Sequence, residues 1–135
     1  MIISLIDYSS YNNLDHFVEF VGNQKDITSF LSNADIFILA SKKEGLPISL
    51  LEALSFKLPI ISSNISGSRE CVIEGENGIL FKSGDKKALA EIYCSLDKYN
   101  WGEFGETSRK LFESKFQFNQ MQESYIDLLN ELYIH

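Results

Sequence analysis

The stretch that decides the fold runs from Ser41 to Glu52 and reads SKKEGLPISLLE. It follows a nearly continuous apolar run, DIFILA over residues 35–40, which is typical of a strand buried on both faces of a parallel sheet. Pro47 favours the first turn of a helix, where its missing N–H group costs nothing. The stretch therefore predicts a strand, a loop and a helix in succession. The loop lies at the carboxyl end of the strand, where open parallel sheets bind their ligands.

The same alternation of short apolar runs and helical patterns continues on both sides of this stretch. Strands are expected over residues 17–21, 35–40, 59–63 and 78–81. Helices are expected over residues 26–33, 47–56 and 68–73, and after the last strand over 85–97, 103–114 and 119–133. The first sixteen residues favour an amphipathic helix. Alternation of this kind predicts an α/β fold with a mainly parallel sheet, flanking helices and a helical C-terminal segment.

Length and composition narrow the class of protein. The 135 residues are enough for one domain, and 44% hydrophobic with 23% charged residues is a globular composition. The net charge of −7 disfavours nucleic acid as a partner. Cys71 and Cys94 lack the spacing of a disulfide framework or a zinc site and are expected to be reduced thiols. The sequence contains neither a membrane-spanning apolar run nor a basic leader, so a cytoplasmic location is expected.

The loop between residues 41 and 47 has the features of an anion site. Leu46 has no side-chain oxygen to cap the helix, so the first amide groups keep a partial positive charge that attracts phosphate. Gly45 lets a ligand approach the backbone closely. Glu44 and Glu52 flank the helix start, and carboxylates accept hydrogen bonds from the vicinal hydroxyl groups of sugars and ribose. These residues alone also fit a solvated loop glutamate and a surface helix glutamate.

Four motifs follow one another along the chain, namely SxxEGLPxxLLEAL (41–54), LPIIS (58–62), GxxE (67–70) and GxNGIL (75–80). In this order, over about residues 18–133, the sequence resembles the group 1 retaining glycosyltransferases of the GT-B fold. The resemblance implies a single C-terminal, Rossmann-like domain, residues 1–135, that binds a nucleotide-diphosphate sugar.

The resemblance also implies a role for each site residue. Glu44 and Glu52 would form the E-x7-E motif of the family, with Glu44 at the donor sugar as the candidate catalytic residue and Glu52 at the ribose. The backbone amides of Gly45 and Leu46 would face the diphosphate or the sugar hydroxyls. A carboxylate near the donor can stabilise oxocarbenium-like charge at the anomeric carbon. The donor would be a UDP- or GDP-sugar, and neither a metal ion nor another cofactor is expected.

The implied function is the donor half of a glycosyltransferase, with hexosyl transfer to a glycan or lipid-linked acceptor in cell-surface polysaccharide synthesis. The acceptor-binding domain of the family, and the arginine and lysine that hold the diphosphate there, cannot be located in this sequence. The chain alone is therefore expected to be catalytically incomplete, with Lys42 and Lys43 as partial replacements for that basic pair. Lys57 and Ser66 are further departures, because they stand where the family usually has glycine.

Two other interpretations stay open on the sequence alone. Nucleotide-sugar epimerases share this architecture, although they fit the motifs less well. A noncatalytic remnant or interaction module would keep the fold without binding a nucleotide. Apolar residues at helical spacing in the last expected helix further predict a homodimer through that helix. They are Met121, Tyr125, Leu128, Leu129 and Leu132.

Overall fold

The computed structural model describes residues 2–117, 123 and 126–131. Its helices are α1 (Ile2–Tyr11), α2 (Thr28–Asn33), α3 (Ile48–Ser55), α4 (Ser66–Cys71), α5 (Lys86–Tyr93) and α6 (Trp101–Leu111). A short 3-10 helix, η1 (Leu96–Lys98), precedes α6, and a π-helical turn, η2 (Phe112–Phe116), follows it. The strands are β1 (Phe37–Leu39), β2 (Ile60–Ser63) and β3 (Gly78–Phe81).

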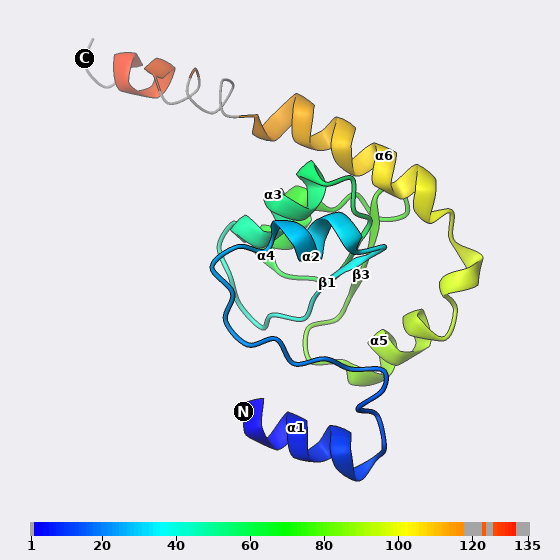
Figure 1. Ribbon diagram of the computed structural model, residues 1–135. Coiled ribbons are helices and arrows are strands. Elements are labelled where there is room, and N and C mark those ends of the chain that lie inside the picture. Colours follow the sequence, from blue (N-terminus) through cyan, green and yellow to red (C-terminus); the bar gives the residue numbers. More distant parts are fainter. Residues whose placement is uncertain (1, 118–122, 124–125, 132–135) are drawn as a thin grey trace.

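The strands form one parallel sheet in the order β1-β2-β3 at the centre of the molecule (Figure 1). Phe37 pairs with Ile60, which in turn pairs with Gly78, so the strands start level with one another. All four residues of β2 are buried because this strand is central and covered on both faces. The expected α/β class with a parallel sheet and flanking helices is confirmed.

The main core lies on the face of the sheet that packs against α3 (Figure 1). Phe37, Leu39 and Ile60 point to this side, because side chains alternate between the two faces of a strand. The buried residues of this cluster are Leu31, Leu50, Ala53, Leu54, Leu58, Ile60, Cys71, Val72 and Phe116. They come from elements along most of the chain, so α2, α3, α4 and η2 are held together by one core.

The opposite face of the sheet has a thinner cover. Ile38 and Ile61 lie on this face and line a pocket of about 280 Å³ together with Tyr93 and Leu96 of the α5–η1 region. In the described part of the chain, α5 contributes no buried residue, and Ile38 remains 41% exposed. The expectation that the run over residues 35–40 is buried on both faces is therefore wrong, because β1 is an edge strand of the described sheet and one of its faces has only a thin cover. The sheet is stabilised mainly from the α3 side.

The prediction of a strand over residues 17–21 is wrong. These residues form an irregular, exposed segment, in which the side chain of Phe17 is 84% exposed. A strand is stable only when neighbouring strands satisfy its backbone, and no strand pairs with this segment in the described ranges. The β-forming side chains of the segment therefore did not decide its conformation.

The expected helices are present with shifted ends. The first sixteen residues contain α1, the helix expected over 26–33 is α2, and those expected over 47–56 and 68–73 are α3 and α4. The helix expected over 85–97 is divided into α5 and η1. The hydroxyl group of Ser95 donates to the carbonyl groups of Glu91 and Ile92, and such bonds compete with continuation of the helix.

The last two expected helices have different outcomes. The helix expected over 103–114 begins already at Trp101, because the side chain of Asn100 accepts a hydrogen bond from the amide of Glu103 and caps the first turn. Of the helix expected over 119–133, residues 126–131 are helical, whereas 119–122, 124–125 and 132–133 lie outside the described residues. None of the helices described is long and apolar enough to cross a bilayer.

Candidate functional site

The loops that follow the three strands meet at the carboxyl edge of the sheet. Because the strands are parallel and in register, the segments after Leu39, Ser63 and Phe81 all leave the sheet on this side. The crevice outside the carboxyl ends of the strands is the usual ligand site of open α/β sheets. The segment from Ser41 to Glu52 begins at this edge and continues into α3.

The start of α3 has no side-chain cap. Pro47 is the N-cap residue, with φ −73° and ψ 117°, and no side chain in the described ranges bonds to the first turn. The amide of Leu50 donates to the Pro47 carbonyl at 3.1 Å, which leaves the amides of Ile48 and Ser49 at the exposed helix end. The predicted uncapped helix start is therefore confirmed, with Pro47 at the cap position rather than inside the first turn.

Glu44 lies in the exposed loop between β1 and α3. Its Oε1 atom accepts a hydrogen bond of 2.6 Å from the hydroxyl group of Ser41. The carbonyl group of Ser41 in turn accepts a hydrogen bond of 2.6 Å from the hydroxyl group of Ser63, at the end of β2. The carboxylate is thus connected to the sheet through two hydrogen bonds, although its own surroundings are open to solvent.

The backbone next to Glu44 contacts a neighbouring helix. Gly67, in the first turn of α4, is buried, and a Cβ atom on it would overlap the carbonyl group of Gly45. The contact orients Gly45, while the space on the Cα side of Gly45 itself is free of described atoms within 4 Å. Leu46 follows with 39% of its surface exposed. The amides of Gly45 and Leu46, which the resemblance assigns to a diphosphate, therefore lie on an exposed loop. This loop is held in place by the contact between Gly45 and Gly67.

Glu52 lies in the second turn of α3 and is half-buried. Within the described part of the chain, its carboxylate has neither a hydrogen bond nor an ion pair. Glu44 bonds to Ser41 and not to Glu52, so the two glutamates are held separately, one by a loop and one by a helix. This arrangement leaves acceptor oxygens on both side chains for a ligand.

A pocket of about 290 Å³ lies at the same edge, at the carboxyl ends of β1 and β3. Lys42 and Lys86 line it and bring positive charge, while Phe81 and Leu89 form an apolar wall. The side chain of Asp85 also lines the pocket, but it caps α5 by accepting a hydrogen bond of 2.9 Å from the Ala88 amide. Of the two lysines that sequence analysis singled out, Lys42 contributes to this pocket, whereas Lys43 is exposed outside its lining.

Sequence reasoning missed a set of buried hydroxyl groups behind the site. Ser62 and Ser68 are fully buried and share a hydrogen bond of 2.7 Å that joins β2 to α4. Ser63 is 1% exposed and bonds to the loop after β1. Ser63 and its partner Ser41 are 22 residues apart in the sequence, so no local pattern signals this contact.

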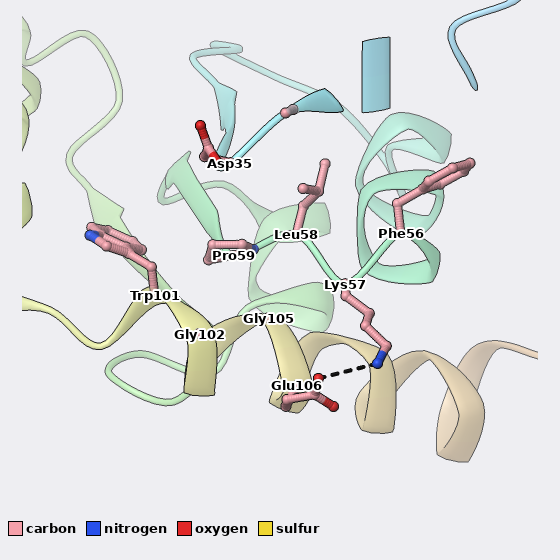
Figure 2. Close-up of a pocket in the computed structure, with 10 residues that line it drawn as sticks. Asp35, Phe56, Lys57, Leu58, Pro59, Trp101, Gly102, Gly105 and Glu106 are labelled. Atoms are coloured by element: carbon pink, nitrogen blue, oxygen red, sulfur yellow. Dashed lines mark hydrogen bonds and ion pairs between the residues drawn. The ribbon is translucent and has the colours of Figure 1, made fainter. Parts of the chain in front are cut away.

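A second pocket, of about 310 Å³, lies at the opposite end of the sheet (Figure 2). Residues that precede β1 and β2, such as Asp35 and Pro59, line it together with the start of α6. Figure 2 shows Trp101 on one side of this pocket and, on the other, Lys57, whose ammonium group pairs with Glu106 at 3.1 Å. This pocket lies at the amino ends of the strands, away from the usual ligand position, and none of the predicted site residues lines it.

No group of three or more histidine, cysteine, aspartate or glutamate side chains that could hold a metal ion occurs among the residues with a described position. That no metal ion or cofactor takes part stays a prediction.

Fold and site together define an open parallel α/β domain with its polar loop cluster at the carboxyl edge of the sheet. The chain belongs to the family of glycosyl transferases group 1, whose match covers residues 5–120. The predicted family is therefore confirmed, and the family match favours a glycosyltransferase over the epimerase alternative.

Individual relatives agree with this family. The capsular polysaccharide biosynthesis glycosyltransferase CapM of Staphylococcus aureus is 29% identical over 120 residues, which cover 84% of this chain and 32% of CapM. The amylovoran biosynthesis glycosyltransferase AmsK of Erwinia amylovora is 37% identical over 94 residues, 64% of this chain and 23% of AmsK. The chain thus spans a third or less of the length of these relatives.

Solved structures share the fold. Anabaena Alr3699/HepE, crystallised with UDP and with UDP-glucose, superposes with a TM-score of 0.85 at 21% identity. The superposition covers 96% of this chain and 36% of HepE. At this level of identity the likeness demonstrates a common fold.

Proposed function

We propose that this chain is the donor-binding part of a glycosyltransferase, which binds a nucleotide-diphosphate sugar for hexosyl transfer to a glycan or lipid-linked acceptor. In this proposal the chain forms the C-terminal, Rossmann-like domain of such an enzyme. The observation that carries the proposal is the segment Ser41–Glu52. It combines an uncapped helix start with a carboxylate, Glu44, that is oriented by its own loop.

Each part of the segment suits one part of such a donor. The free amides at the start of α3 and the ammonium groups of Lys42 and Lys86 suit a diphosphate. The carboxylate of Glu52 suits the vicinal hydroxyl groups of a ribose, and that of Glu44 suits the donor sugar. In the transfer step, Glu44 would stabilise positive charge that develops at the anomeric carbon.

The comparisons support the choice of donor and of pathway. The names of CapM and AmsK refer to capsular polysaccharide and amylovoran biosynthesis, which supports a role in the synthesis of a cell-surface polysaccharide. The HepE structures contain UDP and UDP-glucose, which makes these two ligands the first to test, followed by GDP and GDP-mannose.

The experiment compares three glutamate variants by thermal shift and calorimetry with UDP and UDP-glucose. Glu52→Ala should weaken the binding of both ligands by about 1.5 to 3 kcal/mol, because both contain the ribose. Glu44→Ala should weaken chiefly UDP-glucose. Glu106→Ala is the matched control, because Glu106 is an exposed carboxylate at the amino ends of the strands and should leave both affinities unchanged.

Two outcomes would contradict the proposal. If neither the uridine nor the guanosine ligands stabilise the wild-type chain at millimolar concentration, the noncatalytic remnant is the better interpretation. If Glu44→Ala and Glu52→Ala weaken bare UDP equally, the assignment of the two glutamates to sugar and ribose is wrong.

The proposal includes two statements about the rest of the enzyme. The acceptor-binding domain would come from a further domain or another polypeptide, so the chain alone should bind donor without transferring sugar. The cytoplasmic location expected from the sequence stays a prediction.

A homodimer through the C-terminal helix is a separate part of the proposal. Ile126, Leu128 and Leu129 are exposed by 48%, 51% and 38%, which supports an apolar surface on residues 126–131. Met121, Tyr125 and Leu132, which the sequence assigns to the same stripe, lie outside the described residues.

A further inference from the structure

Two hydrogen bonds in series connect the central strand to the Glu44 carboxylate. The hydroxyl group of Ser63, the last residue of β2, donates to the Ser41 carbonyl at 2.6 Å. The hydroxyl group of Ser41 donates to Oε1 of Glu44, also at 2.6 Å. Ser63 is 1% exposed, so the series begins in the buried interior and ends at the exposed Glu44.

The loop that carries Glu44 has few other attachments to the sheet. Residues 42–46 are all exposed, and the contact of the Gly45 carbonyl with Gly67 is made by the backbone behind Glu44. That contact fixes where the chain runs but does not fix the direction of the Glu44 side chain. The hydroxyl group of Ser41 does so, because it selects a carboxylate orientation with one oxygen bonded and leaves the Oε2 atom free to accept from a ligand.

We propose that Ser41 and Ser63 are positioning residues for Glu44, with Ser63 fixing the loop and Ser41 fixing the carboxylate that receives the donor sugar. This inference rests on the proposed function, since the two serines have this role only if Glu44 binds a donor sugar. Ordering the carboxylate before the ligand arrives reduces the entropy lost on binding and holds the charge where the anomeric carbon would react. Neither serine is expected to touch the nucleotide.

The chain offers a matched control for the buried serine. Ser62 is adjacent to Ser63, is fully buried and bonds through its hydroxyl group to Ser68 at 2.7 Å. Its hydroxyl group also donates to the Ser63 carbonyl at 3.2 Å, but among the described residues it has no hydrogen bond to the Ser41–Glu44 loop. Ser62→Ala and Ser63→Ala therefore each remove one buried hydroxyl group from β2, but only Ser63→Ala releases the loop. Ser41→Thr is the control for Ser41, because it keeps the hydroxyl group.

The first measurement needs no ligand. The 13C resonance of the Glu44 side-chain carboxyl group is assigned by its disappearance in Glu44→Gln and is then followed in the serine variants at neutral pH. It should shift in Ser41→Ala and Ser63→Ala and stay at the wild-type position in Ser62→Ala and Ser41→Thr. An unchanged resonance in Ser41→Ala would overturn the inference whatever the chain binds.

The second measurement is the dissociation constant for UDP divided by the dissociation constant for UDP-glucose. This ratio isolates the contribution of the sugar, so a general loss of stability does not change it. Ser41→Ala and Ser63→Ala should lower the ratio about threefold to tenfold, as expected for the loss of one hydrogen bond. Ser62→Ala and Ser41→Thr should keep it within about twofold of wild type.

The outcomes separate the inference from the proposed function. Equal losses of UDP and UDP-glucose affinity in Ser41→Ala would overturn the positioning role while leaving a nucleotide site in place. A wild-type chain that binds neither UDP, UDP-glucose nor their guanosine counterparts would overturn the proposed function, and the donor-site purpose of the two serines with it.

Discussion

The carbonyl group of Gly45 lies directly against Gly67, which joins the loop after β1 to the first turn of α4. A Cβ atom on Gly67 would overlap this carbonyl group and would lie 2.6 Å from Cδ of Pro47. Any larger residue at position 67 would therefore push the start of α3 away from α4. A single glycine thus determines how closely two loops of the candidate site approach each other.

Replacement of Gly67 by alanine should disturb both stability and the site. We expect Gly67→Ala to lower the free energy of unfolding by about 1 to 3 kcal/mol, because backbone atoms must move to accept the methyl group. It should also weaken any binding of UDP. Chemical denaturation and calorimetry measure the two effects.

Gly102→Ala is the control for that substitution. Gly102 lies in α6, and among the described residues a Cβ atom on it would meet only the side chain of Asn100, at an ordinary distance of 3.6 Å. Since alanine favours a helix, Gly102→Ala should keep or raise the stability, by up to about 1 kcal/mol. Equal stability of the two alanine variants would contradict the close contact at Gly67.

Replacement of Lys57 by glycine should stabilise the chain. Lys57 has a left-handed backbone conformation, φ +60°, at the end of α3, where the Leu58 amide donates to the Ala53 carbonyl. Glycine adopts this conformation without the strain of a Cβ atom, which is worth roughly 1 kcal/mol. The exposed Lys57–Glu106 pair that would be lost contributes less. We expect a raised Tm in Lys57→Gly.

Lys57→Ala separates the two effects at this position. It removes the ion pair with Glu106 but keeps a Cβ atom in the left-handed region, so its Tm should not exceed that of wild type. A gain in Lys57→Ala equal to that in Lys57→Gly would show that the ion pair, and not backbone strain, is unfavourable.

The two cysteines should differ in reactivity. Burial raises the pKa of the Cys71 thiol to about 11, and the neighbouring Glu70 carboxylate acts in the same direction. Cys94 is exposed. Iodoacetamide at pH 8 should therefore modify Cys94 in the folded chain and Cys71 only after denaturation, which peptide mass spectrometry detects. Rapid modification of Cys71 in the native chain would contradict its position in the core.

The raised pKa of the Cys71 thiol should make the chain less stable at alkaline pH. The folded pKa of about 11 is above the ordinary thiol pKa of 9.0, so the unfolded state loses the proton first as the pH rises. The free energy of unfolding should fall between pH 9 and pH 11, by at most about 3 kcal/mol. Cys71→Val should remove this part of the pH dependence, and an unaltered dependence in that variant would assign the effect to other groups.

Asn77 should be a structural residue of the turn before β3. It is fully buried, its Oδ1 accepts from the Ile73 amide at 2.7 Å, and its Nδ2 donates to the Cys71 carbonyl at 2.9 Å. Asn77→Ala should destabilise the chain by about 2 to 4 kcal/mol, because the buried Cys71 carbonyl and the part-buried Ile73 amide lose their partners. Exposed Asn64 provides the control, and Asn64→Ala should change the stability by less than about 0.5 kcal/mol.

The proposed dimer should depend on the exposed leucines of the C-terminal helix. Light scattering at tens of micromolar should give about twice the mass of 15.4 kDa, and Leu128→Glu with Leu129→Glu should return the chain to a monomer. A wild-type mass near that of a single chain would rule out the dimer. Ile48→Glu, at an exposed apolar position on α3, is the control and should leave the mass unchanged.

Local sequence was sufficient to predict the parallel sheet and the helix start at the candidate site. The apolar runs of β2 and β3 form largely buried strands, whereas β1 lies at the edge of the described sheet and its Ile38 is 41% exposed. Pro47 and Leu46 predict a helix start without a cap, and the structure has one. These features depend on residues within one turn or one strand, so the sequence contains their cause.

Tertiary structure decided the features that depend on residues far apart in the sequence, such as strand pairing and the hydrogen bonds behind Glu44. Residues 17–21 have the side chains of a strand but no neighbouring strand among the described residues, and pairing rather than propensity makes a strand. The bonds from Ser63 to Ser41 and from Ser41 to Glu44, and the contact of Gly45 with Gly67, exist only because the parallel sheet brings the ends of β1 and β2 together. The sequence alone determined which residues form the candidate site, whereas the fold decided how the site is held, because its supports lie on separate elements.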